Sequence, residues 1–177
     1  MKTGDGGFRP AYNVQFATDG DTRLIVAVDV TNNGSDAGQM APMHERVQKA
    51  YGHAPRDYLV DGGFATIEDI TKVEQAGSRV GAPMNYDERI SRRGGDPHAR
   101  RARDTDEMAE FRRRMATDEA KTIYRQRPSI AEFPNAECRN RGLRQFPVRG
   151  LEKVRAVTLW YALAFNFLRM RTLKIIG

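Results

Sequence analysis

The chain has 177 residues, of which 40% are apolar, and this is enough for one domain of ordinary size with a hydrophobic core. Its single cysteine excludes an internal disulfide framework and a cysteine-built zinc site, and we expect a reducing compartment. The net charge of +6 is uneven, because residues 121–177 hold 12 Lys or Arg against 3 Asp or Glu. Such a basic region indicates a polyanionic partner, most often nucleic acid, although a solvated basic face fits it equally well.

The first half of the chain has the alternation of strand-like and helix-like segments that is typical of an α/β fold. Two strand-like runs are separated by the DGDT segment of residues 19–22, which predicts a hairpin. The expected elements are, in order, strands at residues 12–18 and 24–30, a helix ending near Tyr51, a strand at 57–60, a helix at 66–75 and a strand at 78–84. Ser35 or Asp36 is expected to cap the first helix, and Gly52 to end it. This order predicts one layer of mixed sheet with flanking helices.

The second half of the chain begins with a charged segment, residues 85–104, that carries a GGDP turn and lacks apolar periodicity. We expect it to be a loop or insertion rather than core. Its arginine-rich part, residues 92–103, is either a DNA-contacting loop or a soluble excursion, and clustered arginine favours DNA. Thr105 is expected to cap the next helix. A second helical stretch is interrupted by Pro128, where the chain should bend or restart.

A final helix is expected from about residue 151 to residue 170. It contains the longest near-apolar run of the chain, residues 156–168, which is too short to span a bilayer and predicts a buried helix. Trp160 is expected in its core rather than on a base-stacking surface. No signal peptide is recognisable. We therefore divide the chain into an irregular start, residues 1–11, and one domain, residues 12–177.

Three acidic residues stand out by their positions. Asp19 follows the first strand, Asp61 follows the third, and Glu132 lies in the helical region beyond the charged loop. Ligands gather at the carboxyl ends of strands in open α/β sheets, and carboxylates without His or Cys suit Mg²⁺ or Mn²⁺. Two such ions can activate a water for phosphodiester cleavage. A purely structural role stays open for each residue: Asp19 could start a turn, Asp61 could be a turn or capping residue, and Glu132 could be an acidic residue on a helix surface.

Four motifs occur in order between residues 12 and about 170. YNVQFATD ends on Asp19, TNNGSDAGQ follows the second strand, and VDGGF contains Asp61. The segment YRQRPSIAEFPNAECR carries a Y-R-E-K/R signature in Tyr124, Arg127, Glu132 and Arg139. Together with the closing segment RGLEKVRAVTLWYALAFNFLRM, these motifs closely resemble those of the DDE transposases of bacterial insertion sequences, in the branch with that signature.

The resemblance implies a ribonuclease H-like fold: a mixed sheet with flanking helices and a charged insertion before the helix that carries the third acidic residue. It implies that Asp19, Asp61 and Glu132 hold two Mg²⁺ or Mn²⁺ ions. In this family, water attacks the phosphodiester at a transposon end, and the freed 3′-hydroxyl then attacks target DNA. No covalent intermediate between protein and DNA is implied.

The resemblance also implies that Tyr124, Arg127 and Arg139 bind DNA phosphates. Arginine binds phosphate through charge-assisted and often bidentate hydrogen bonds. On one helix, Tyr124, Arg127 and Glu132 would fall roughly on one face. The segment FPNAECR departs from the P-x-F-G-x-I-K run that is usual in the family, and its last position, residue 139, is Arg rather than Lys.

Two classes of function follow from the resemblance. The first is a metal-dependent polynucleotidyl transferase, and the second is a non-enzymatic remnant that binds DNA or inhibits a full-length transposase by mixed assembly. We expect an N-terminally truncated catalytic region, because family members usually carry a further region ahead of the core. A ribonuclease H-type hydrolase shares the fold and the metals, but the signature favours transposition. The expected partners are DNA and a second copy or a full-length transposase, without a membrane, in the bacterial cytoplasm and on the nucleoid when bound to DNA.

Overall fold

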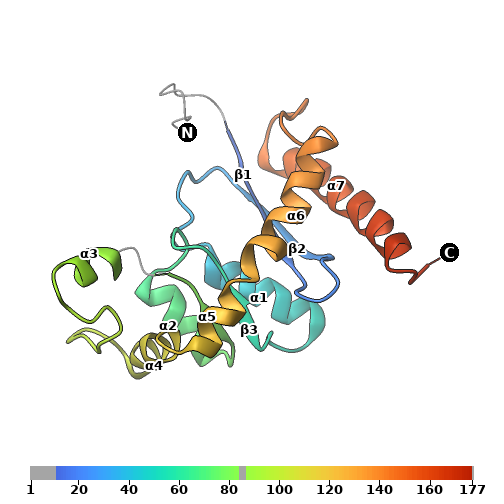
Figure 1. Ribbon diagram of the computed structural model, residues 1–177. Coiled ribbons are helices and arrows are strands. Elements are labelled where there is room, and N and C mark those ends of the chain that lie inside the picture. Colours follow the sequence, from blue (N-terminus) through green and yellow to red (C-terminus); the bar gives the residue numbers. More distant parts are fainter. Residues whose placement is uncertain (1–10, 84–86, 177) are drawn as a thin grey trace. The chain divides into compact units, whose positions relative to one another are not determined.

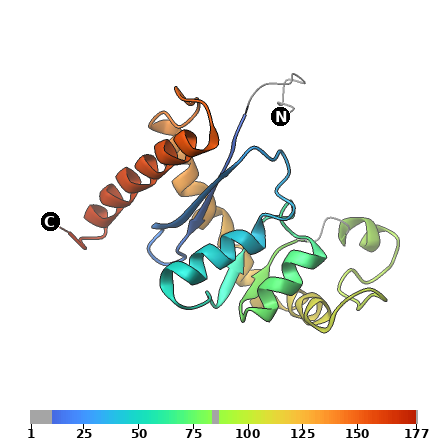
Figure 2. The ribbon, with the colours of Figure 1, turned by 180° about the vertical axis from the view of Figure 1, so that it is seen from behind.

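The computed structural model describes residues 11–83 and 87–176 (Figure 1, Figure 2). Residues 1–10 of the expected irregular start, and residues 84–86, lie outside this description. The described residues form strands β1 (Asn13–Thr18), β2 (Ile25–Thr31), β3 (Asp57–Leu59) and β4 (Arg79–Gly81), and helices α1 (Met40–Tyr51), α2 (Ile67–Gln75), α3 (Asp87–Arg92), α4 (Asp106–Met115), α5 (Asp118–Tyr124), α6 (Arg127–Asn140) and α7 (Leu151–Thr172). The predicted order strand, strand, helix, strand, helix, strand is confirmed for the first six elements.

The chain divides into two compact units. Unit 1 comprises residues 1–34 and 128–177, and unit 2 comprises residues 35–127. The expected single mixed sheet is absent from the described residues, which form two separate two-stranded sheets. In unit 1, β1 and β2 pair antiparallel as the predicted hairpin, and in unit 2, β3 and β4 pair parallel over three residues each. There are two sheets because each strand pairs only with the other strand of its own unit, β1 with β2 and β3 with β4.

Unit 1 is built on the β1–β2 hairpin, with α6 and α7 beside it in both views (Figure 1, Figure 2). Its core is formed by one side of β2, α6 and α7, through Ile25, Val28, Cys138, Ala162 and Phe165. The amide of Asn166 ties α7 to β2, because its Oδ1 accepts from the backbone N–H of Ile25 and its Nδ2 donates to the Ile25 carbonyl, both at 2.8 Å. These bonds fix the rotation of α7 about its axis.

Helix α7 is buried along one side only. Val154, Thr158, Ala162 and Phe165 face the core. Trp160, by contrast, is 70% exposed, and several other large apolar side chains of α7 are exposed with it. The expectation of a wholly buried helix with Trp160 in its core is therefore wrong. The apolar run makes α7 apolar on two opposite sides, and only one of these sides packs against β2.

Unit 2 packs α1, α2 and α4 around the β3–β4 pair, with a core that includes Met40, Ile70, Val80 and Phe111. The predicted cap of α1 is wrong, because α1 begins at Met40 with Gln39 as an N-cap residue that makes no side-chain cap bond. The carboxylate of Asp69 on α2 accepts instead from the backbone N–H groups of Gly38 and Ala41, at 2.9 and 3.2 Å. A side chain distant in sequence thus satisfies the donors at the start of α1.

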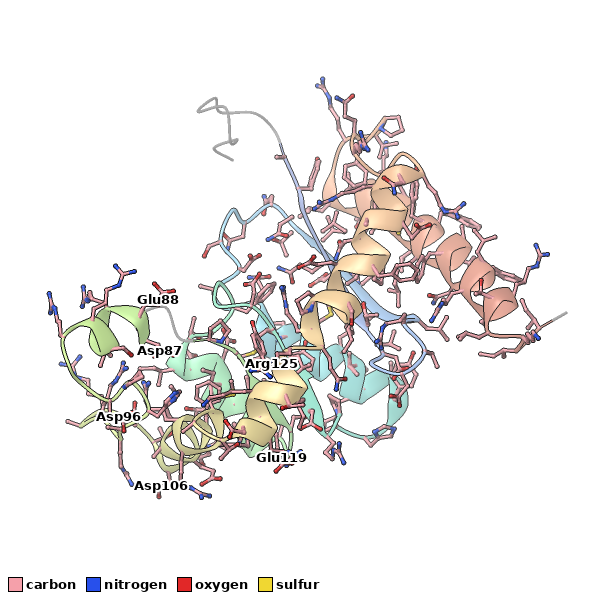
Figure 3. The ribbon with its side chains drawn as sticks, viewed as in Figure 1. Asp87, Glu88, Asp96, Asp106, Glu119 and Arg125 are labelled. Carbon is pink, nitrogen blue, oxygen red and sulfur yellow. The ribbon has the colours of Figure 1, made fainter. Side chains whose placement is uncertain are left out.

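The charged segment is anchored to unit 2 by a buried ion pair. Arg112 on α4 donates from Nε to Asp104 Oδ2 at 2.8 Å, and both side chains are 1% exposed. The expected loop contains the six-residue helix α3, which buries no residue. Figure 3 labels Asp87 and Glu88 on α3 and Asp96 in the turn that follows. The segment is therefore a polar, largely exposed loop whose C-terminal end is fixed by the Arg112–Asp104 pair. Its charged composition predicts such a loop.

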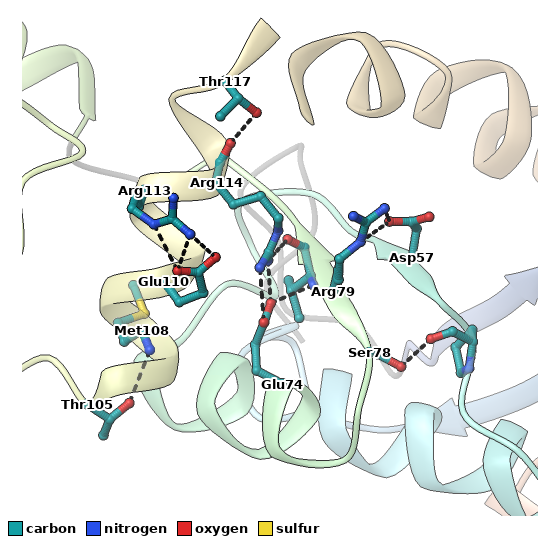
Figure 4. Close-up of polar contacts among 12 residues, drawn as sticks. Asp57, Glu74, Ser78, Arg79, Thr105, Met108, Glu110, Arg113, Arg114 and Thr117 are labelled. Carbon is teal, nitrogen blue, oxygen red and sulfur yellow. Dashed lines mark hydrogen bonds and ion pairs between the residues drawn. The ribbon is translucent and has the colours of Figure 1, made fainter. Parts of the chain in front are cut away.

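Side-chain hydrogen bonds also fix the end of the parallel strand pair (Figure 4). Glu74 on α2 accepts from the backbone N–H of Val80 at 2.7 Å and from Arg114 on α4. Arg79 on β4 donates to Asp57 on β3 at 3.0 Å. These contacts hold β4 between α2, α4 and β3, although each strand is only three residues long.

The helical stretch around Pro128 is two helices. Helix α5 ends at Tyr124, and α6 starts at Arg127, so Pro128 occupies the first turn, where its missing N–H costs nothing. The predicted restart is confirmed. The predicted common face of Tyr124, Arg127 and Glu132 on one helix is wrong, because the chain breaks between the first two. Helix α6 also continues to Asn140, through the buried Pro134.

None of the helices in the described parts of the chain has the length and apolar character that a membrane crossing requires.

Candidate active site

Asp61 lies just beyond β3, where the parallel pair ends. The ladder continues one residue past β3, since the Val60 N–H donates to the Gly81 carbonyl at 3.0 Å. The chain then turns: the Phe64 N–H donates to the Asp61 carbonyl at 3.2 Å, and the Gly63 N–H donates to Asp61 Oδ1 at 2.8 Å. The Asp61 side chain stays 46% exposed. The turn therefore orients a carboxylate at the strand end and leaves it accessible.

Arg127 and Tyr124 lie beside Asp61 in unit 2. Arg127 Nη2 donates to Asp61 Oδ2 at 3.2 Å, and the Arg127 side chain is 21% exposed. Tyr124 packs over the end of β4, where its ring would lie 3.6 Å from a Cβ at Gly81. Burial raises the pKa of the Tyr124 hydroxyl, with Asp61 adding to the rise and Arg127 opposing it. Unit 2 therefore brings together three of the six residues predicted from the sequence.

Asp36 is a neighbour of Asp61 that we expected only as a helix cap. A Cβ placed on Gly63 would lie 3.1 Å from Asp61 Oδ1 and 3.4 Å from Asp36 Oδ2. The two carboxylates therefore flank Gly63, and no side chain fits between them without a shift. The TNNGSDAGQ motif contains Asp36, but its residue pattern alone does not indicate this proximity.

Asp19 lies in the turn of the β1–β2 hairpin in unit 1. Its Oδ2 accepts from the Thr22 backbone N–H at 2.8 Å and from the Thr22 hydroxyl at 2.6 Å. Burial raises the pKa of Asp19, but the hydrogen bonds from Thr22 and Asp21 and the charge of Arg23 outweigh it, so the net shift is downward. The carboxylate is ionised and stabilises the turn. This is the structural role in a turn that the sequence left open as an alternative to metal binding.

Glu132 and Arg139 lie on α6, also in unit 1. Ile130 of α6 faces the hairpin turn, 3.8 Å from where a Cβ at Gly20 would lie. Glu132 is two positions further along, so it projects about 200° around the helix axis from Ile130. Both Glu132 and Arg139 are exposed. The geometry of unit 1 therefore places Asp19 and Glu132 on neighbouring elements, the hairpin turn and α6.

The described residues of either unit form no cluster of three or more His, Cys, Asp or Glu side chains that could hold a metal ion. Asp61 belongs to unit 2, whereas Asp19 and Glu132 belong to unit 1. The donor set itself consists of carboxylate oxygens, which are the ligands that Mg²⁺ and Mn²⁺ prefer. An accessible carboxylate at a strand end, with a second beside it, fits such an ion chemically.

A family model for the transposase DDE domain matches residues 1–167. The chain belongs to the transposase DDE domain family. This family comprises polynucleotidyl transferases that act on DNA and generally use divalent metal ions. The comparisons with curated proteins and with solved structures gave no match. The family assignment confirms the resemblance that the motifs carry, at the level of the DDE transposase domain.

Proposed function

We propose that this DDE transposase domain cleaves phosphodiester bonds at transposon ends and joins the 3′-hydroxyl to target DNA, in the bacterial insertion-sequence branch with the Y-R-E-K/R signature. The observation that carries the proposal is Asp61 with Arg127 at the end of a parallel strand pair, within a chain of this family. The fold is proposed to be ribonuclease H-like. Residues 12–177 are the catalytic domain in this proposal, with residues 85–104 as a charged insertion.

Asp19, Asp61 and Glu132 are the proposed ligands of two Mg²⁺ or Mn²⁺ ions. When bound, such ions would activate the attacking water or hydroxyl and stabilise the leaving oxygen. The chain's own contribution at Asp61 is orientation: the Gly63 N–H holds Oδ1 at 2.8 Å and leaves the carboxylate half exposed. Asp36 stands on the other side of Gly63 and adds negative charge where a cation would bind.

Tyr124, Arg127 and Arg139 are the proposed phosphate-binding residues. Arg127 is already directed at Asp61, so its guanidinium lies where a phosphate would approach a carboxylate-bound ion. Unit 1 has exposed basic residues of its own that we propose as further DNA contacts, and they include Arg139, Arg141, Arg144, Arg149, Lys153 and Arg155. The proposed location is the bacterial cytoplasm, with the protein on the nucleoid when it is bound to DNA.

A second function is a non-enzymatic protein that binds DNA, or that inhibits a longer transposase by mixed assembly with it. One observation favours it: Asp19 is engaged in its own turn through Thr22. A domain with this feature keeps its basic surface whether or not it cleaves DNA.

The deciding experiment is a nicking assay on supercoiled DNA with Mg²⁺, with Mn²⁺ and with EDTA. The enzymatic proposal predicts metal-dependent nicking that Asp61→Asn abolishes. As a matched control, Asp118→Asn removes a charge from a side chain that is fully exposed on α5, and it should nick normally. If the wild-type chain binds DNA but does not nick it with either metal, the non-enzymatic function replaces the enzymatic one.

A further inference from the structure

The turn that carries Asp19 contains a residue in an unfavourable backbone conformation. Arg23 has a φ of 65°, in the left-handed region that residues other than glycine adopt only when their surroundings hold them there. Inside the turn, the Asp19 N–H donates to the Leu24 carbonyl at 2.9 Å, and the Arg23 N–H donates to the Asp19 carbonyl at 3.0 Å. The direction of the Asp19 carboxylate therefore depends on whatever keeps this turn in place.

Helix α7 holds the turn and the start of β2 from one side. Asn166 exchanges two hydrogen bonds with the backbone of Ile25. Three residues further along, and hence on the same side of the helix, Arg169 Nε donates to the Thr22 carbonyl at 2.7 Å. Thr22 in turn donates to the Asp19 carboxylate from its N–H and from its hydroxyl. Thr22 thus connects the guanidinium of Arg169 to the carboxylate of Asp19.

Arg169 also contacts α6. Its guanidinium carbon lies 5.6 Å from the centroid of the Phe133 ring, which is within the range of a cation–π interaction. The Phe133 ring meets Phe165 of α7 edge to face, with 5.8 Å between the ring centroids. Phe133 directly follows Glu132 in α6. One guanidinium therefore contacts both the turn of Asp19 and the residue next to Glu132.

A cation in the last turn of a helix has a simpler role, because it interacts favourably with the helix dipole. Arg169 and Arg171 both occupy the last turn of α7 and share this role. Arg171 is exposed, whereas Arg169 is half-buried against Thr22 and Phe133. The two arginines are therefore a matched pair: the dipole accounts for both, but only Arg169 has these two contacts.

We propose that Arg169 is a positioning residue that fixes the Asp19 turn against α6 and so sets the placement of Asp19 relative to Glu132. It acts through Thr22 and Phe133, and it contacts neither carboxylate. The inference rests on the proposed function, in which Asp19 and Glu132 are metal ligands. It assigns to the end of α7 a part in the reaction that the acidic residues and the phosphate-binding residues do not cover.

Amide hydrogen exchange, followed by NMR on the full chain, tests whether Arg169 holds the turn. Arg169→Met keeps the length of the side chain and removes its donors. The amides of Asp19, Thr22 and Arg23 should then exchange at least ~10-fold faster, while the amides of the β1–β2 ladder keep their rates. Arg171→Met removes the same charge from the same helix turn, and it should leave all these rates unchanged.

Two further variants separate the contacts that Arg169 makes. In Arg169→Lys the ammonium can still donate to the Thr22 carbonyl, so protection of the turn amides should return to within about 3-fold of the wild type. Phe133→Leu removes the ring under the guanidinium and should speed the same exchange by a smaller factor, about 2–5-fold. Circular dichroism and urea midpoints check that each variant is folded under the conditions of the measurement.

Metal binding and kinetics test the link to the reaction. In Arg169→Met, Mn²⁺ electron paramagnetic resonance should show binding weakened at least ~5-fold. The nicking kcat should fall about 10-fold with the KM for DNA within about 2-fold of the wild type. A residue that only supports the fold would lower the urea midpoint and leave Mn²⁺ binding and kcat of the folded chain unchanged. A DNA contact would instead raise KM.

Three results would overturn the proposal: wild-type exchange of the turn amides in Arg169→Met, equal effects of Arg171→Met, or a change in KM alone. Absence of both Mn²⁺ binding and nicking in the wild type is a different result, because it removes the proposed function itself. The amide exchange still decides in that case whether Arg169 fixes the turn, so the two failures are distinguishable.

Discussion

Arg127 Nη2 donates a hydrogen bond to Asp61 Oδ2 at 3.2 Å, so the carboxylate at the end of β3 already faces a cation supplied by the chain. A divalent ion that binds Asp61 must displace or share this guanidinium. An arginine that is moved off the carboxylate can donate to a phosphate instead. The pair therefore links the proposed metal ligand to the proposed phosphate contact within one unit.

Removing the Asp61 charge should abolish catalysis without unfolding the protein. Asp61→Asn keeps an acceptor for the Gly63 N–H but removes the charge that a divalent ion requires. We expect metal-dependent nicking to fall by about 100-fold or more, which corresponds to ~2.7 kcal/mol of barrier. The measurement is the initial nicking rate, with the urea midpoint as a folding check. Nicking at the wild-type rate in Asp61→Asn would remove Asp61 from the site.

Removing Arg127 should have opposite effects on metal and on DNA. Arg127→Ala takes a competing cation away from Asp61, so Mn²⁺ should bind roughly 3–10-fold more tightly, a gain of up to ~1.4 kcal/mol. DNA binding should weaken, because a phosphate contact is lost. Mn²⁺ electron paramagnetic resonance and fluorescence anisotropy at fixed salt measure the two effects. Arg125→Ala, which removes an exposed arginine two positions away, is the control. Equal effects of the two variants would contradict the role of Arg127.

The buried Arg112–Asp104 pair should be a strong determinant of unit 2 stability. Arg112→Met leaves Asp104 buried without its partner, and we expect the free energy of unfolding to drop by about 3–5 kcal/mol. Disrupting the exposed Arg113–Glu110 pair by Glu110→Gln should cost less than about 1 kcal/mol. Urea denaturation measures both. If both variants lost the same free energy of unfolding, burial would not determine how much an ion pair contributes to stability.

The buried Arg112–Asp104 pair should also make the free energy of unfolding depend on pH in the acid range. Burial raises the pKa of Asp104, but the hydrogen bonds and charges of Arg112 and Arg101 outweigh it and hold the pKa below its ordinary value. A lowered carboxyl pKa contributes stability that is present above the unfolded value near 3.9 and is lost as pH falls through the folded value. Stability should therefore decline below about pH 4, and Asp104→Asn should flatten that decline in a series of urea titrations.

His44 should make unit 2 sensitive to pH in a higher range. Its Nε2 is 2.7 Å from the Ser78 hydroxyl, and because that hydroxyl donates to the Pro55 carbonyl, Nε2 carries a proton and donates to Ser78 Oγ. Burial lowers the pKa of His44 below 6.5, with Glu45 opposing. Because the unfolded chain takes up a proton first, stability should fall as pH drops below about 6.5. Urea midpoints between pH 7.5 and pH 5 should show this fall, and it should be smaller in His44→Gln.

The local features of the fold could be predicted from the sequence because they depend on neighbouring residues. Thr66 and Thr105 cap α2 and α4, and Gly52 ends α1 in the left-handed conformation, as their residue types indicate. The start of α1 could not be predicted, because it is set by Asp69 from another helix. Nor could the exposure of Trp160, because an apolar run does not show which side of a helix finds a partner.

The candidate site was predictable to a similar degree. Asp61 followed from its place after a β-strand, and Arg127 from the family motif, and the structure pairs them. The proximity of Asp36 to Asp61 depends on how the chain returns past Gly63, which no local pattern encodes. The turn role of Asp19 was visible in the DGDT segment, whose Thr22 supplies both hydrogen bonds.

The most direct measurement is a crystal structure of the chain with Mn²⁺, with the ions located by anomalous scattering. The proposed function predicts Mn²⁺ coordinated by Asp61, with Asp19 and Glu132 completing the ligands at distances near ~2.2 Å and Arg127 displaced from the Asp61 carboxylate. Well-ordered crystals in which Asp61 keeps its bond to Arg127 and no ion binds any of the three carboxylates would contradict the metal-dependent mechanism.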